Sequence, residues 1–73
     1  MFIQVTDTDG DDMLIPVDGI AAVIAGLKET NILMKEDCQV TIQGKKCFCY
    51  VVKDHIGSIA AKLERRGGRY EHN

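Results

Sequence analysis

Short strand-like runs rich in apolar and β-branched residues, separated by turn residues, dominate this chain, and the clearest helical periodicity is in its last segment. Phe2–Thr6 and Met13–Val17 have the first two strand patterns. The Asp9-Gly10 pair between them is typical of a hairpin turn. Ile20–Leu27 suits either a helical turn or a buried strand, and we favour a strand that ends near Gly26.

The second half of the chain continues with strand patterns and ends in the helix. Asn31–Lys35 and Cys38–Gln43 have the pattern of one long or broken strand, and Lys46–Lys53 has the clearest strand pattern in the chain. Asp54 is placed to cap a helix over residues 54–66 by accepting first-turn amide hydrogen bonds. The apolar stripe expected on this helix is formed by Ile56, Ile59, Ala60 and Leu63.

This order of elements predicts an α+β fold, in which a small, strongly curved antiparallel sheet of about four to five strands carries one C-terminal helix. The length of 73 residues indicates one domain over residues 1–66, and we expect residues 67–73 to form a mobile tail. A chain this short has few residues with which to enclose a large pocket, and it has no nucleophile elbow or phosphate-binding glycine motif. We therefore expect no catalytic activity and no cofactor.

Cys47–Val52 is apolar on both faces of its expected strand, and so is Met13–Ile15. One helix covers one face of a sheet, and an apolar face that stays exposed is typical of a protein interface. We therefore expect a homo-oligomer, most simply a symmetric dimer. The alternative is a tightly curled barrel with a core and a partly apolar surface. The residues expected in the self-association face are Met13, Ile15, Phe48, Tyr50 and Val52.

The formal net charge is only −2, but the charges are unevenly distributed along the chain. Residues 1–37 hold eight acidic and two basic residues, whereas residues 38–73 hold three acidic and seven basic residues. Such asymmetry steers one subunit onto another or offers an acidic surface to a basic partner. The alternative is two solvated faces. The acidic residues expected to bind a partner are Asp7, Asp9, Asp11 and Asp12.

Two groups of residues contain side chains of the types that bind metals, but their spacing along the sequence differs from that of the usual metal sites. Residues 7–18 place carboxylates at four EF-hand ligand positions, but Asp12 stands where the calcium loop needs Gly, so we favour a hairpin turn. The other group contains a Cys-X-Cys pair, which is not the usual zinc-chelating spacing, so we favour free, partly buried thiols and no metal. Its members are Cys38, Cys47, Cys49 and His55.

The chain has no segment suited to cross a membrane or direct export. Its longest uncharged run, Gly19–Leu27, has nine residues, whereas a membrane helix needs about 20. Met1–Asp7 has no basic signal region, and three cysteines are an odd number. We expect a cytoplasmic protein that does not associate with membranes.

Four segments follow one known layout: Ile3–Gly10, Ile15–Ile20, Thr41–Lys46 and Val51–Asp54. The layout is a strand ending in Val-Thr, an Asn/Asp-Gly hairpin, a strand closing on an Asn-x-x-x-Ile turn, a Gly-Lys hairpin, and a strand leading into a short helix. It resembles the FlbD/SwrD family of flagellar-associated proteins. The chain departs from that pattern through the longer stretch Ala25–Val40, its three cysteines, and Asp18 in place of Asn. The resemblance implies a small β-rich module that works by contact.

The leading functional prediction is a small, non-catalytic interaction module that self-associates through its sheet and presents an acidic surface to a basic partner. One alternative, from size and charge alone, is a phage- or mobile-element-encoded inhibitor of a host defence or nucleic-acid enzyme. The other alternative is a module that binds nucleic acid or a nucleotide through its basic C-terminal half. The residues of that second alternative are Lys45, Lys46, Arg65, Arg66 and Arg69.

Overall fold

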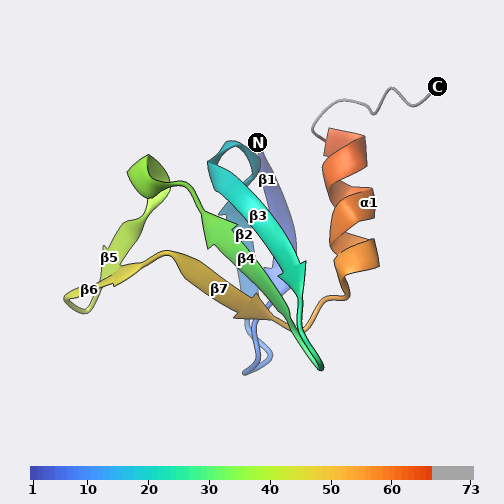
Figure 1. The fold of residues 1–73 in the computed structure, drawn as a ribbon, viewed down its shortest axis with the longest axis horizontal. Coiled ribbons are helices and arrows are strands. Elements are labelled where there is room, and N and C mark those ends of the chain that lie inside the picture. Colours follow the sequence, from blue (N-terminus) through green and yellow to red (C-terminus); the bar gives the residue numbers. More distant parts are fainter. Residues whose placement is uncertain (67–73) are drawn as a thin grey trace.

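The computed structural model describes residues 1–66, and within them the chain forms seven strands and one α-helix (Figure 1). The strands are β1 (Phe2–Thr6), β2 (Asp12–Pro16), β3 (Ile20–Ala25), β4 (Thr30–Met34), β5 (Val40–Ile42), β6 (Lys45–Cys47) and β7 (Cys49–Val52). The helix α1 spans Ile56–Arg66, and the short 3-10 turns η1 and η2 span Val17–Gly19 and Glu36–Cys38. The α+β class with one C-terminal helix is confirmed, with seven strands in place of four to five. The expected tail, 67–73, lies outside the described residues.

The strands form three antiparallel sheets: the hairpin β1–β2, the sheet β3–β4–β7 with β4 in its centre, and the hairpin β5–β6. Figure 1 shows β1–β2 behind the three-stranded sheet, with α1 beside them. The hairpin β5–β6 projects at the other end of the molecule, whose longest dimension is 45 Å. We call this projecting hairpin the arm.

The two layers that β1–β2 and β3–β4–β7 form are joined at two corners, by backbone hydrogen bonds at one and by the chain itself at the other. Asp7 forms an antiparallel bridge with Val52, and the Lys53 amide donates to the Thr6 carbonyl at 2.8 Å. At the opposite corner the chain itself joins the layers, because β2 continues through η1 directly into β3. The layers therefore meet at their corners without closing into a barrel.

Both hairpin turns have the residues that their backbone geometry requires. Gly10 in the β1–β2 turn has φ +91°, which is strained for a residue with a side chain. Between β5 and β6, Gln43 and Gly44 have φ +52° and +81°. Positive φ at both residues of a two-residue loop matches the strand twist of a tight hairpin. The turns expected at these two positions are confirmed.

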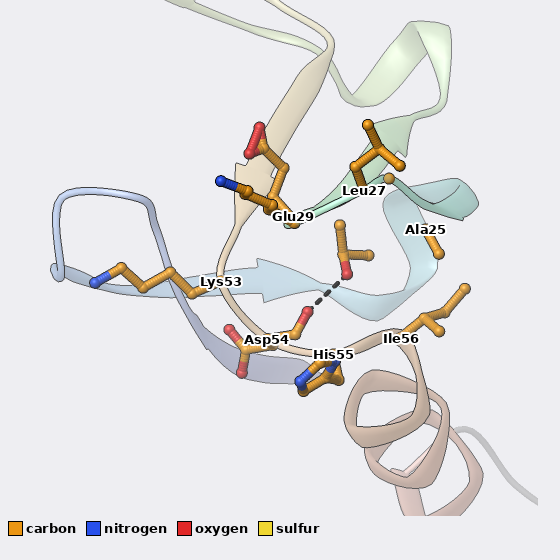
Figure 2. Close-up of a pocket in the computed structure, with 10 residues that line it drawn as sticks. Ala25, Leu27, Glu29, Lys53, Asp54, His55 and Ile56 are labelled. Atoms are coloured by element: carbon orange, nitrogen blue, oxygen red, sulfur yellow. Dashed lines mark hydrogen bonds between the residues drawn. The ribbon is translucent and has the colours of Figure 1, made fainter.

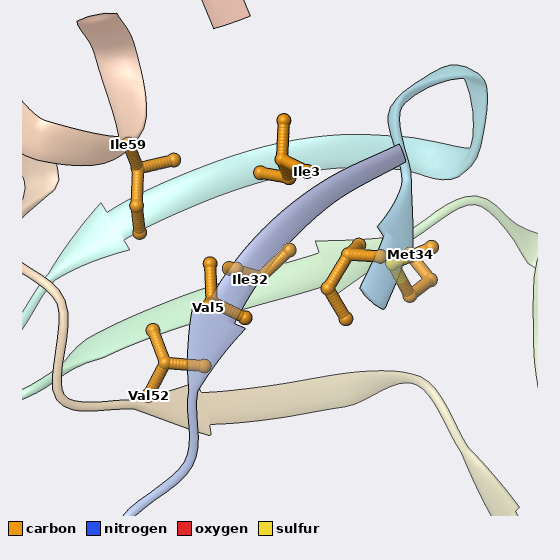
Figure 3. Packing of buried hydrophobic residues seen from close by; sticks show 7 residues of the cluster. Ile3, Val5, Ile32, Met34, Val52 and Ile59 are labelled. Atoms are coloured by element: carbon orange, nitrogen blue, oxygen red, sulfur yellow. The ribbon is translucent and has the colours of Figure 1, made fainter. Parts of the chain in front are cut away.

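The core lies between the two layers and is closed at one side by α1 (Figure 3). Its buried members are Ile3, Val5, Ile15, Ile32, Met34, Val52 and Ile59. Three of these seven come from β1–β2 and one comes from α1. The hairpin, more than the helix, therefore covers the inner face of the three-stranded sheet, which differs from the expected cover by a helix alone.

Three strand predictions have different outcomes. Ile20–Leu27 does contain a strand, which ends at Ala25. The expected long or broken strand after Asn31 is broken by η2. The continuous strand expected over Lys46–Lys53 is wrong, because it divides at Phe48 into β6 and β7. The division allows β7 to stay in the sheet while β6 leaves it for the arm.

Asp54 does not cap α1, contrary to expectation. Within the described chain, its Oδ1 accepts a hydrogen bond from the Thr6 amide of β1 at 2.8 Å. Its Oδ2 lies 3.4 Å from Lys62 Nζ, and Lys62 also donates to the Gln4 carbonyl at 2.5 Å. The side chains of Asp54 and Lys62 therefore satisfy backbone groups of β1 that face away from β2, and they fix α1 beside that strand.

Candidate interaction surface

The residues expected to form a self-association face lie mostly inside the molecule. Ile15 and Val52 are 3% and 0% exposed, so their side chains belong to the core. Met13 and Tyr50 are half-buried and pack against that core. Phe48 alone is largely exposed, at 57%. The side of β7 that carries Tyr50 and Val52 faces β1–β2, and a role of these residues in self-association stays a prediction.

The opposite side of the three-stranded sheet is the uncovered apolar face. Directly paired residues of neighbouring strands point to the same face of a sheet. Leu33 pairs with both Ala22 and Cys49, and Asn31 pairs with both Ile24 and Val51. Figure 1 views the sheet from this side, with no described element in front of it. We call this surface the outer face: Ala22, Ile24, Asn31, Leu33, Cys49 and Val51.

The outer face is only partly shielded from solvent. Ile24 is 50% exposed, and the side chains of Leu33, Cys49 and Val51 are half-buried. Asn31 is the one polar residue of the six, and its Oδ1 lies 3.9 Å from the Sγ of Cys49. The residues of this face were not identified from the sequence, because Ile32, Leu33 and Met34 are consecutive apolar residues and do not indicate which side of β4 meets the core.

The arm has a second, smaller apolar surface. Val40 pairs with Cys47 and Ile42 pairs with Lys45, whereas Thr41 pairs with Lys46. The first two pairs therefore share one side of the arm, which we call the arm face: Val40, Ile42, Lys45 and Cys47. Val40 and Ile42 are 47% and 50% exposed, and no arm residue belongs to the core cluster.

The four acidic residues expected to bind a partner lie together in the β1–β2 turn and at the start of β2, in a segment that we call the acidic turn (Asp7–Asp12). Asp7 is half-buried, and its Oδ1 accepts hydrogen bonds from the amides of Asp9 and Asp11, both at 2.9 Å. The side chains of Asp9, Asp11 and Asp12 are exposed. Asp7 therefore shapes the turn, and the other three carboxylates face solvent.

The basic residues of the nucleic-acid alternative are not brought together. Lys45 and Lys46 are exposed on β6, and Arg65 is exposed near the end of α1. Arg66 is the last residue of α1, and Arg69 lies outside the described residues. In Figure 1, β6 and the C-terminal end of α1 are at opposite ends of the long axis. Lys45 and Lys46 therefore lie at one end of the molecule and Arg65 lies at the other, so the three do not form one basic surface.

A small hollow lies between the β3–β4 turn and the loop from β7 to α1 (Figure 2). It measures about 100 Å³ and is lined by Ala25–Thr30 and Lys53–Ile56. Thr30 Oγ1 donates to the Asp54 carbonyl at 2.6 Å on one side of it. Pockets for small organic ligands measure about 300–1,000 Å³. The hollow has room for a few water molecules, and His55 is not accompanied there by a cysteine.

The three cysteines are free and half-buried, in different parts of the molecule. Cys47 lies on the arm face, Cys49 lies on the outer face, and Cys38 packs against the core. Within residues 1–66 no three His, Cys, Asp or Glu side chains are arranged to hold a metal ion. The same part of the chain has no helix with the length and apolarity needed to cross a membrane.

Among the described residues, Tyr50 has a distinctly altered environment. Burial raises the pKa of Tyr50 above its ordinary value, and the negative charge of a Cys47 thiolate raises it further. The neutral phenol is therefore the form that the fold favours. This result agrees with the inward orientation of Tyr50 toward the core.

No protein-family model matches the chain, and comparisons with curated proteins and with solved structures find no similar protein. The resemblance to FlbD/SwrD proteins therefore stays a prediction from the sequence. The functional argument depends on the surfaces themselves, namely the outer face, the arm face and the acidic turn.

Proposed function

We propose that this chain is a non-catalytic protein-interaction module that self-associates through its outer face. The observation that carries the proposal is the group of five apolar side chains on three paired strands, with no described element in front of them. Removing apolar surface from water is favourable by about 25 cal/mol per Å². An apolar sheet face of this kind is typical of a contact between proteins.

The second part of the proposal is that the acidic turn contributes charge to binding of a basic partner. Asp9, Asp11 and Asp12 are exposed, and the two hydrogen bonds to Asp7 hold the backbone that carries them. Clustered surface charge mainly raises the rate of encounter with an oppositely charged surface, whereas apolar contacts determine how long the complex lasts.

The outer face is tested by placing a charge on it, at the edge strand β3. Ile24→Lys is expected to weaken self-association at least about tenfold, because a lysine ammonium loses hydration when it is covered. Light scattering over a concentration series measures the change. Leu14→Lys is the matched control, since Leu14 is 66% exposed on β2, away from the outer face. Equal self-association of Ile24→Lys and Leu14→Lys would contradict the proposal.

The acidic turn is tested with a lysine-rich peptide on a resin. Replacing Asp9, Asp11 and Asp12 by Asn should lower the salt concentration that elutes the protein. The control replaces three other exposed acids, Asp18→Asn, Glu36→Gln and Asp37→Asn, and changes the net charge equally. Identical elution of the two triple variants would show that net charge, and not the acidic turn, determines binding.

A further inference from the structure

We infer that the outer face is covered by the arm of a second copy of this chain, in a reciprocal exchange between two protomers. This inference rests on the proposed function, because it names the partner that the outer face binds. It connects two apolar surfaces of the same protomer that the fold leaves uncovered.

The arm does not have a core of its own. Each of its strands has three residues, and every residue from Val40 to Lys46 is exposed. A two-stranded hairpin in water is at best marginally stable on its own. Another protein surface against the arm face would order it.

The two surfaces match in size. A strand of three residues is about 10 Å long, and three neighbouring strands span about 10 Å from the first axis to the third. One arm laid across the outer face would therefore reach all three strands of β3–β4–β7. Val40 and Ile42 would then pack against side chains such as Leu33 and Val51.

Charge favours a second copy as the partner. Lys45 is on the same side of the arm as Val40 and Ile42, so the arm face combines apolar residues with a cation at its tip. The acidic turn is adjacent to the end of β7, because Asp7 pairs with Val52 there. The outer face thus adjoins the group of carboxylates that would attract this lysine, and every copy carries both halves of the contact.

Two-fold symmetry would let both contacts form at once. A contact between different surfaces of identical chains closes into a dimer only when each copy gives its arm and receives the other. The exchange would leave neither arm face exposed, and it would stop the chain from assembling further.

The test mixes two variants that each lose one half of the contact. Ile42→Lys disables the arm face, and Ile24→Lys disables the outer face. When either variant is present alone, every contact contains one altered face. Each variant alone should therefore dimerise at least about tenfold more weakly than the unaltered chain. An equal mixture restores one intact contact per pair and should form heterodimers, detected by sedimentation velocity with one variant labelled.

Two matched variants identify the arm face. Thr41→Lys adds the same charge as Ile42→Lys on the other side of the arm and should change dimerisation less than about twofold. Lys45→Glu should weaken dimerisation at low salt more than Lys46→Glu does. Circular dichroism checks that each variant is folded. If Ile24→Lys unfolds the sheet, Ile24→Thr replaces it in the mixture, because a β-branched residue is favoured in strands.

The outcomes separate this inference from the proposed function. Failure of the mixture to form heterodimers, while the unaltered chain dimerises, would overturn the arm exchange and leave self-association of one outer face with another. A monomeric unaltered chain would overturn both. Equal effects of Ile42→Lys and Thr41→Lys would also overturn the arm exchange, because they would show that the arm face has no special role.

Discussion

At the scale of single residues, Asp54 contributes more to the fold than its position before a helix suggests. Its carboxylate binds the Thr6 amide and lies beside Lys62, and its carbonyl accepts from Thr30. One residue thus connects β1, β4 and α1. Because Thr6 and Thr30 are 48 and 24 residues away in sequence, the sequence indicated only the local role of a helix cap.

Substitution of Asp54 tests this role. Asp54→Ala should lower the free energy of unfolding by about 1–3 kcal/mol, because the half-buried Thr6 amide loses its acceptor. Asp54→Asn keeps an acceptor oxygen and should lower it less. Urea unfolding measures both. If Asn and Ala have equal effects, the hydrogen bond to Thr6 is not the source of the stabilisation.

Tyr50 makes stability depend on pH in the alkaline range. The fold raises its pKa above 10.0, so the unfolded chain loses this proton first as the pH rises. The contribution of Tyr50 to stability is therefore present below pH 10.0 and decreases as the pH rises through the folded pKa.

The variant Tyr50→Phe should remove this part of the alkaline loss. Its melting temperature should stay close to that of the unaltered chain at neutral pH and fall less steeply above pH 10.0. Thermal unfolding followed by circular dichroism across this pH range gives the comparison. Parallel pH profiles for the two proteins would show that Tyr50 is not shielded by the fold.

At the scale of elements, α1 contributes to the core through a narrower stripe than its sequence indicates. Ile59 is fully buried and Leu63 is half-buried against the core, whereas Ile56 is 40% exposed and Ala60 is exposed. The helix packs at the side of the two layers, so one edge of the predicted stripe stays in solvent.

Two isoleucines of α1 test which side of the helix faces the core. Ile59→Ala should lower the free energy of unfolding by about 2–5 kcal/mol, since it leaves a cavity in the core. Ile56→Ala removes the same atoms from a partly exposed site and should cost about 1 kcal/mol or less. Chemical denaturation of the two variants gives the difference directly. Similar losses at both positions would mean that α1 is rotated from the orientation described.

The elements were more predictable than the faces they present. Asp9-Gly10 and Gln43-Gly44 located two hairpins, because few residues adopt positive φ without strain. The orientation of β7 was not predictable, because Cys49–Val52 is apolar on both sides and alternation alone does not say which side meets the core. The outer face depends on which side of the three-stranded sheet β1–β2 covers, and the arm face depends on β6 leaving that sheet. Both are properties of the tertiary structure.

At the scale of the whole molecule, the apolar surfaces that residues 1–66 leave in contact with solvent include the outer face and the arm face. The β1–β2 hairpin and α1 both cover the inner side of the three-stranded sheet, so neither of them covers its outer side. Within residues 1–66, no element lies in front of the outer side. The cover that we propose for the outer face is a second copy of the chain.

The solution mass of the unaltered chain tests this claim most directly. Light scattering across a series of protein concentrations should show a rise from the protomer mass of 8.1 kDa to twice that value. The rise should occur at lower protein concentration in low salt, where opposite charges attract more strongly. A mass that stays at 8.1 kDa at every concentration and at both salt levels would contradict the account.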